Sequence, residues 1–178
     1  MVVTEEVDIA VVQRHEGATA SNARLGGYHM DRHCPTTEFR CYRVRLEQSD
    51  ENRLFGLTEF INQTRGQSCR LRDVLPGASA IQRVASFITA GINLRSRSGL
   101  ELVLVTAELH GAPLVAIDGN HRAMAQFLAH GSVEGVPAFV CVHPAIGQWP
   151  YVPPLARAYT RQAEPLSWPT DLIENENP

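Results

Sequence analysis

The chain has 178 residues, 44% of them hydrophobic and 20% charged, which fits one globular domain with a single hydrophobic core. Its net charge of −3 excludes a chain-wide basic field for nucleic acid. All 16 basic residues are arginine, so a phosphate site cannot use a Walker-type lysine and must use arginine, histidine and backbone N–H groups.

The two ends of the chain are predicted to flank the domain. Residues 1–38 form a partly irregular N-terminal arm, in which Val7–Val12 is expected to be a short strand. Residues 16–27 are small and polar, which is typical of a loop or a disordered segment. Residues 144–178 form a Pro-rich extension with a helix expected over 155–163.

The domain itself is predicted over residues 39–143, and it begins with a strand and two helices. Phe39–Leu46 alternates between two faces, which predicts a strand with one face toward the core. Leu54–Ile61 is predicted to be a short helix. A longer helix is predicted from the N-cap Ser79 to Gly91. Its expected core stripe consists of Ile81, Val84, Ala85 and Ile88.

The second half of the domain alternates strands with one helix. Residues 100–107 and 138–142 are apolar runs that predict buried strands, and 109–113 predicts a chain reversal. Leu114–Ile117 predicts another buried strand, and a helix follows from His121. The apolar face of this helix comprises Ala123, Met124, Phe127 and Leu128. This order of elements predicts a small α+β (mixed α/β) domain.

The cysteines and the apolar runs predict a cytoplasmic protein. The Met1 end lacks a basic region followed by an apolar run, and no apolar stretch is long enough to span a bilayer. None of the four cysteines forms a C-x-x-C pair, so reduced thiols are expected. Cys34 and Cys41 lie near His29 and His33, but their spacing matches no standard zinc signature.

A strand, a polar turn and a helix meet at the stretch Asp118-Gly-Asn-His-Arg122. Gly119 tolerates a positive φ, and the side chains of Asp118 and Asn120 can bond nearby backbone amides. The first N–H groups of the helix have no intrahelical partner and carry the positive end of its dipole, beside Arg122. The stretch therefore predicts a phosphate site. In the alternative interpretation, Asp118 only caps the helix, and His121 and Arg122 are solvated.

This turn and the elements around it resemble the ParB/sulfiredoxin superfamily over about residues 40–143. The elements that carry the resemblance are the helix 79–91, the strand 100–107, the hairpin, the Asp118–Arg122 turn and Val136-Pro-Ala-Phe-Val140. The turn is most similar to that of free-serine-kinase-like members. The resemblance to the superfamily implies a small mixed sheet flanked by helices. Sulfiredoxins carry a cysteine where this chain has Asn120, so their activity is not expected.

The resemblance implies an ATP- or ADP-dependent phosphotransferase, or a nucleotide hydrolase, that acts on a small molecule. Gly119, Asn120, His121 and Arg122 would bind the nucleotide phosphates. His121 would also serve as acid or base. Asp118 would hold Mg²⁺ brought by the nucleotide, or orient the substrate. Glu51, with Glu47 as the alternative, follows the first strand and is the candidate base for the substrate hydroxyl.

The alternative is a non-catalytic, ParB-like module for nucleotide-dependent regulation or DNA association. Arg65, Arg70 and Arg72 form a local basic group that favours it. The net charge of −3 and the lack of a recognisable helix-turn-helix argue against it. The expected partners are therefore a nucleotide and a small-molecule substrate, without DNA or a membrane, and a homodimer is left open.

Overall fold

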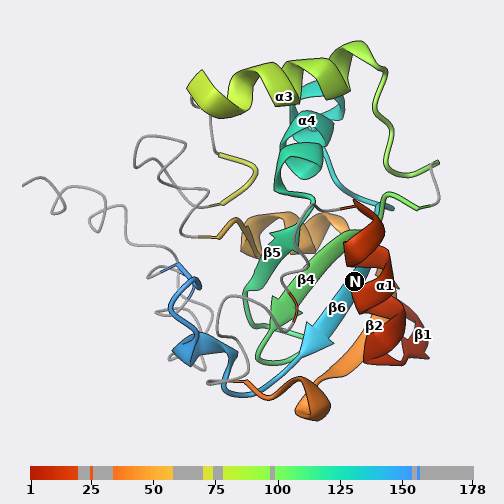
Figure 1. Ribbon diagram of the computed structural model, residues 1–178. Helices are drawn as coiled ribbons and strands as arrows, with labels where there is room; N and C mark the ends of the chain where they lie inside the picture. The colour runs from red at the N-terminus through yellow and green to blue at the C-terminus, as the bar shows by residue number, and fades with distance from the viewer. Residues whose placement is uncertain are drawn as a thin grey trace, which may run out of the picture.

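A six-stranded mixed sheet organises the protein, as the computed structural model shows (Figure 1). Its strands are β1 (Val2–Val7), β2 (Arg40–Arg45), β3 (Leu54–Phe55), β4 (Leu102–Thr106), β5 (Leu114–Asp118) and β6 (Pro137–Val142). They lie in the order β1–β2–β6–β4–β5–β3. The pairs β4–β6 and β3–β5 are parallel, and the other pairs are antiparallel. The structure describes residues 1–19, 25, 34–57, 70–73, 78–96, 99–153 and 156.

Helices cover both faces of this sheet, which confirms the predicted α+β class. The α-helices are α1 (Ile9–Thr19), α3 (Ala78–Thr89) and α4 (Asn120–His130), and the 3-10 helices are η2 (Thr36–Glu38), η3 (Gln48–Arg53) and η4 (Ile146–Gln148). Successive residues of β4 serve opposite faces. Leu102 and Leu104 belong to the core that α4 covers, whereas Val103 and Val105 pack in the core that contains Val12 of α1. α3 lies across α4 (Figure 1).

Most predicted elements of the domain are confirmed. The strands expected at 39–46, 100–107, 114–117 and 138–142 and the helix from His121 are found within two residues at each end. The helix expected from Ser79 is α3, and Gly91 follows it with a φ of 66°. In the described part of the chain, no helix is long and apolar enough to cross a membrane.

The first 19 residues differ from the prediction, because they form β1, which belongs to the sheet, and α1, which packs on the sheet. The strand expected at Val7–Val12 is wrong, since β1 ends at Val7 and α1 follows it. Asp8 marks this boundary: its Oδ1 accepts the backbone N–H of Ala10 at 2.7 Å, as a helix N-cap does. The loop expected from residue 16 is wrong as far as 19, where α1 ends.

Two predictions in the middle of the chain are also wrong. The helix expected at Leu54–Ile61 begins instead as β3, because a short apolar run does not distinguish a buried strand from a buried helix. Residues 58–61 lie outside the described part. Of the stripe predicted for α3, Val84 is buried, but Ile81 and Ile88 are 50% and 38% exposed. α3 therefore turns a narrower face toward α4 than its sequence predicts.

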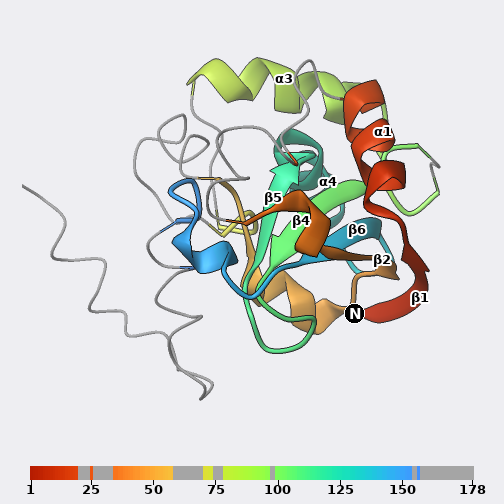
Figure 2. The same ribbon diagram turned by 60° about the horizontal axis from the view of Figure 1, so that its bottom comes forward.

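A buried ionic network joins η3 to the first residue of the chain and to the loop before β5. Asp50 Oδ2 lies 2.8 Å from the Met1 ammonium, and Asp50 Oδ1 accepts two hydrogen bonds from the Arg53 guanidinium, at 2.8 and 3.0 Å. Arg53 also donates to the carbonyls of Leu109 and Ala112. Figure 2 shows the N-terminus beside η3. One carboxylate thus links three separate segments.

The network makes stability depend on the ionisation of Asp50. Burial alone would raise the pKa of its carboxyl, but hydrogen bonds from the Glu47 backbone and the Met1 ammonium, together with Arg53, lower that pKa below its ordinary value. The contribution is therefore present above the unfolded-state pKa and is lost as the pH falls through the folded-state pKa.

We expect Asp50→Asn to lower the free energy of unfolding by about 3–5 kcal/mol near pH 7, because Arg53 stays buried without its carboxylate. Urea unfolding of the wild type and the variant, at pH 7 and in acid, measures the difference. The difference should narrow in acid, where Asp50 of the wild type is protonated. A difference that is independent of pH would show that Asp50 does not act through its charge.

A disulfide bond joins Cys41 and Cys141, which are directly opposed in β2 and β6. The expectation of reduced thiols is therefore wrong for this pair. The antiparallel register brings together two residues 100 positions apart, which the spacing of cysteines in the sequence does not reveal. The bond also removes Cys41 from the zinc ligands considered above. Cys34 is a free thiol, and burial, with Glu38 nearby, raises its pKa to about 11.

Replacement of Cys41 and Cys141 by alanine should lower the free energy of unfolding by about 2–5 kcal/mol, because the cross-link restricts the unfolded chain. Thermal unfolding with and without reductant measures the effect, and non-reducing peptide mapping identifies the linked peptides. The control is Cys34→Ala, which should keep the sensitivity to reductant. Wild-type melting that does not respond to reductant, with no linked peptide, would contradict the assignment.

Candidate functional site

β5 ends in a bulge that changes the face on which Asp118 lies. Val103 opposes Asp118 in the β4–β5 pair, whereas Leu104 opposes Ala116, so the register shifts by one residue at Ile117. Bulges of this kind re-aim the side chains beside them. Strict alternation from Ala116 would place Asp118 on the α4 face, but its pairing with Val103 places it toward the α1 face.

Gly119 connects β5 to α4, and two features of its surroundings require glycine. Its φ of 86° and ψ of 11° lie in the left-handed region. A Cβ atom at this position would lie 2.5 Å from Leu102 Cδ2 and 3.3 Å from Arg122 Nη2. Gly119 is also the N-cap of α4, and it makes no side-chain cap. The helix therefore begins in close contact with the first residue of β4.

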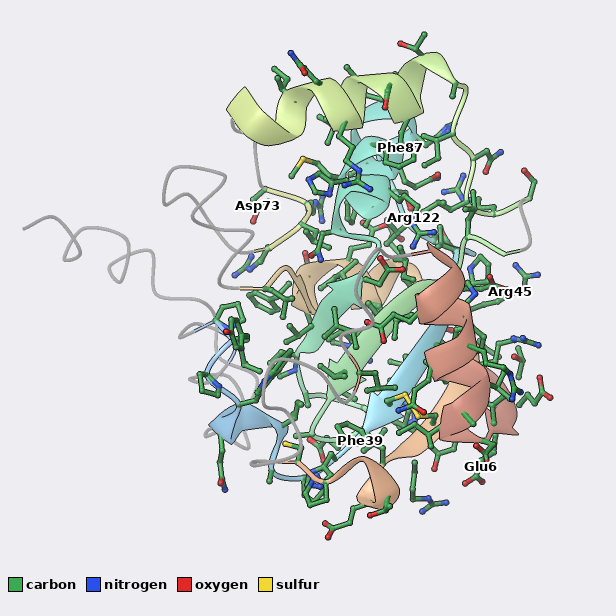
Figure 3. The ribbon with its side chains drawn as sticks, in the orientation of Figure 1. Glu6, Phe39, Arg45, Asp73, Phe87 and Arg122 are labelled. Carbon is green, nitrogen blue, oxygen red and sulfur yellow. A yellow bond between two sulfur atoms is a disulfide. The ribbon has the colours of Figure 1, made fainter. Side chains whose placement is uncertain are left out.

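Asp118 and Arg122 form an ion pair across the first turn of α4. Arg122 Nη2 donates to Asp118 Oδ2 at 2.6 Å, and their side chains are 8% and 15% exposed. Figure 3 labels Arg122 where β5 passes into α4, at the end of the sheet opposite Phe39. The predicted cation is therefore present at the helix N-terminus, but a carboxylate of the same turn offsets its charge.

Asn120 and His121 complete the turn. Asn120 is buried, and its Nδ2 donates to the Ala116 carbonyl at 3.0 Å. Its Oδ1 is also buried, and it accepts no hydrogen bond from any described residue. His121 is partly exposed on the first turn of α4. The structure thus brings the sequence-predicted residues from Asp118 to Arg122 together in one place.

Glu51 is the one predicted site residue that the structure does not bring to this turn. Glu51 Oε1 accepts hydrogen bonds from Ser132 Oγ at 2.5 Å and from the Val133 N–H at 3.1 Å, just beyond the C-terminal end of α4. An 11-residue helix is about 16 Å long, and it separates these residues from the turn. Glu51 is 3% exposed, so it holds the loop after α4.

Glu101 and His15, which the sequence pattern did not single out, lie at the same end of the sheet as the turn. Glu101 directly precedes β4, and the register of Val103 with Asp118, continued by two residues, brings Glu101 alongside Asn120. His15 comes from α1, and its Nε2 donates to the Glu101 carbonyl at 3.1 Å. Neither residue stands in a recognisable motif, and α1 was not predicted, so no sequence signal pointed to them.

The basic group that favoured DNA association is partly neutralised. Arg70 pairs with Asp73 at 3.8 Å, and Arg72 lies 3.9 Å from Glu51 Oε2. Arg65 lies outside the described residues. A cavity of about 230 Å³ opens beside Arg72, toward the C-terminal half of α4 and away from the turn. Its lining consists of Leu71, Arg72, Met124, Phe127, Leu128 and Gly131.

Comparison of the chain with protein-family models, with curated proteins and with solved structures finds no match. The resemblance to the ParB/sulfiredoxin superfamily therefore stays a prediction that rests on the turn and the elements around it.

The close contact at Gly119 predicts how costly a side chain is there. We expect Gly119→Ala to lower the free energy of unfolding by about 2–5 kcal/mol, from left-handed strain of about 1–2 kcal/mol and the clash with Leu102. Gly131 is the matched control, since its φ is 69° but nothing lies within 4 Å of its Cβ position. Gly131→Ala should cost only the strain. Chemical denaturation measures both variants. If Gly119→Ala and Gly131→Ala lose the same free energy of unfolding, the contact with Leu102 is easily relieved.

Proposed function

We propose that the chain binds a magnesium nucleotide at the Asp118-Gly-Asn-His-Arg122 turn and transfers its terminal phosphoryl group to a small molecule or to water. The observation that carries this proposal is the N-terminus of α4, where the N-cap is a glycine that provides no side-chain cap, beside a buried arginine. The resemblance of the turn to kinase-like members of the ParB/sulfiredoxin superfamily supports the same chemistry.

Phosphate oxygens would accept hydrogen bonds from the start of the helix. Among the described residues, no hydrogen-bond partner is found for the backbone N–H groups of Asn120 and Arg122. The dipole of α4 adds positive potential at this point. His121, partly exposed on the same turn, would bond a phosphate oxygen or act as acid or base.

Mg²⁺ fits the charge arrangement at the turn. Asp118 would repel a phosphate that arrived without a metal, because its carboxylate lies at the same helix terminus. Within the described residues, no three metal-ligating side chains come together, so Mg²⁺ would share its coordination between Asp118 and the phosphates. When bound, the ion would neutralise charge on the transferred group. Arg122 would then pair with phosphate.

A nucleotide screen by thermal shift tests the proposal. With Mg²⁺ and a nucleotide at 100 times its Kd, stabilisation should be about 2.7 kcal/mol, which is about 5–10 °C for a chain of this length. Arg122→Lys should lose most of this shift, because lysine keeps the charge but cannot make bidentate contacts with phosphate. Omission of Mg²⁺ should reduce it as well.

Arg40→Lys is the matched control, because Arg40 is 68% exposed and begins β2 at the far end of the sheet. This variant should keep the full shift. No shift of the wild type with any nucleotide would refute the proposal, and an equal shift for Arg122→Lys would place the nucleotide elsewhere. A full shift without consumption of nucleotide would favour the non-catalytic regulatory module.

A further inference from the structure

We propose that Glu101 is the base that activates the acceptor hydroxyl at the Asp118 turn, and that His15 positions its carboxylate. This inference rests on the proposed nucleotide chemistry. It assigns a role that Glu51 is not placed to fill, because the carboxylate of Glu51 is bonded at the opposite end of α4.

Glu101 lies beside the turn for reasons of strand register. Leu102 is in contact range of Gly119, and in an antiparallel pair the residue before Leu102 lies alongside the residue after Gly119. Because β4 alternates, Glu101 shares the α1 face with Val103, and the bulge in β5 brings Asp118 to that face too. A carboxylate and the predicted phosphate site therefore adjoin each other.

Two buried oxygens at this place have no hydrogen-bond donor among the described residues. They are Oε2 of Glu101 and Oδ1 of Asn120. The Glu101 side chain is 13% exposed, and Asn120 is 5% exposed. A buried polar atom without a partner is costly, so such atoms need an explanation. Both are acceptors, which indicates a ligand that brings O–H donors rather than a second anion.

His15 holds the other side of Glu101. Its Nε2 donates to the Glu101 carbonyl at 3.1 Å, and its Nδ1 lies 3.6 Å from Oε2. The imidazole ring also packs against the Phe139 ring, with 5.1 Å between ring centroids. These contacts limit how the carboxylate can rotate.

The step balances without a further reactant. Glu101 takes the hydroxyl proton of the acceptor, and the acceptor oxygen forms a bond to the terminal phosphorus of a nucleoside triphosphate. The bond from that phosphorus to the bridging oxygen breaks, and a nucleoside diphosphate leaves with the electron pair. Glu101 then releases its proton to solvent. The acceptor is therefore a molecule with an O–H group, either an alcohol or water.

The experiment follows ADP formation from Mg·ATP, with water alone and then with glycerol, ribose or ethanolamine as acceptor. Glu101→Gln should lower kcat about 100-fold or more while ATP binding by thermal shift stays as in the wild type. Glu108→Gln is the matched control, because it makes the same chemical change at an exposed position and should keep the rate. His15→Ala should lower kcat with little change in KM, and added imidazole should restore part of it.

The outcomes separate this inference from the proposed function. A wild type that binds no nucleotide overturns both. Normal ADP formation by Glu101→Gln overturns the base assignment and leaves the nucleotide site standing. ATP binding by the wild type without ADP formation from any of the four acceptors also overturns the base assignment. Loss of activity in His15→Ala that imidazole does not relieve, with reduced thermal stability, would make His15 merely structural.

Discussion

The contact between Gly119 and Leu102 sets where β5 passes into α4, and with it the place of the turn from Asp118 to Arg122. A side chain at residue 119 would collide with Leu102, and the positive φ at this point turns the chain directly from β5 into α4. The helix therefore starts against the first residue of β4 instead of at the end of a longer loop. That close start places the N-terminus of α4 next to the residue that precedes β4, which is Glu101.

The alternation of β4 and the bulge of β5 bring side chains from both layers to the same end of the sheet. Leu102 faces α4, but Glu101 and Val103 face α1, where His15 meets Glu101. In a regular strand Asp118 would follow Ala116 toward α4. The register shift at Ile117 pairs Asp118 with Val103 on the α1 side, and Asp118 also accepts a hydrogen bond from Arg122 of α4. A site that lies between the two hydrophobic cores therefore depends on the bulge in β5.

The sequence predicted local features of the chain well, but it did not predict which distant segments come into contact, and the candidate site shows why. The turn from Asp118 to Arg122 is local chemistry, since a strand, a glycine and a helix follow each other within a few residues. Glu51 was assigned by its distance along the chain from a strand, and such a distance says nothing of direction in space. His15 and Glu101 are 86 positions apart, and only the docking of α1 joins them. The disulfide between Cys41 and Cys141 depended in the same way on a register that no spacing encodes.

At this end of the sheet, Asp118 forms an ion pair with Arg122, and Glu101 supplies a second carboxylate. A free anion would therefore gain little, because Asp118 already offsets the charge of Arg122. In the proposed complex, Asp118 would hold the metal, and Arg122 would be available to the phosphate. Each ligand would then favour the state that the other needs, so their affinities would be coupled equally in both directions. The ion pair within the turn is thus a physical reason to propose a magnesium nucleotide, rather than phosphate alone, as the ligand.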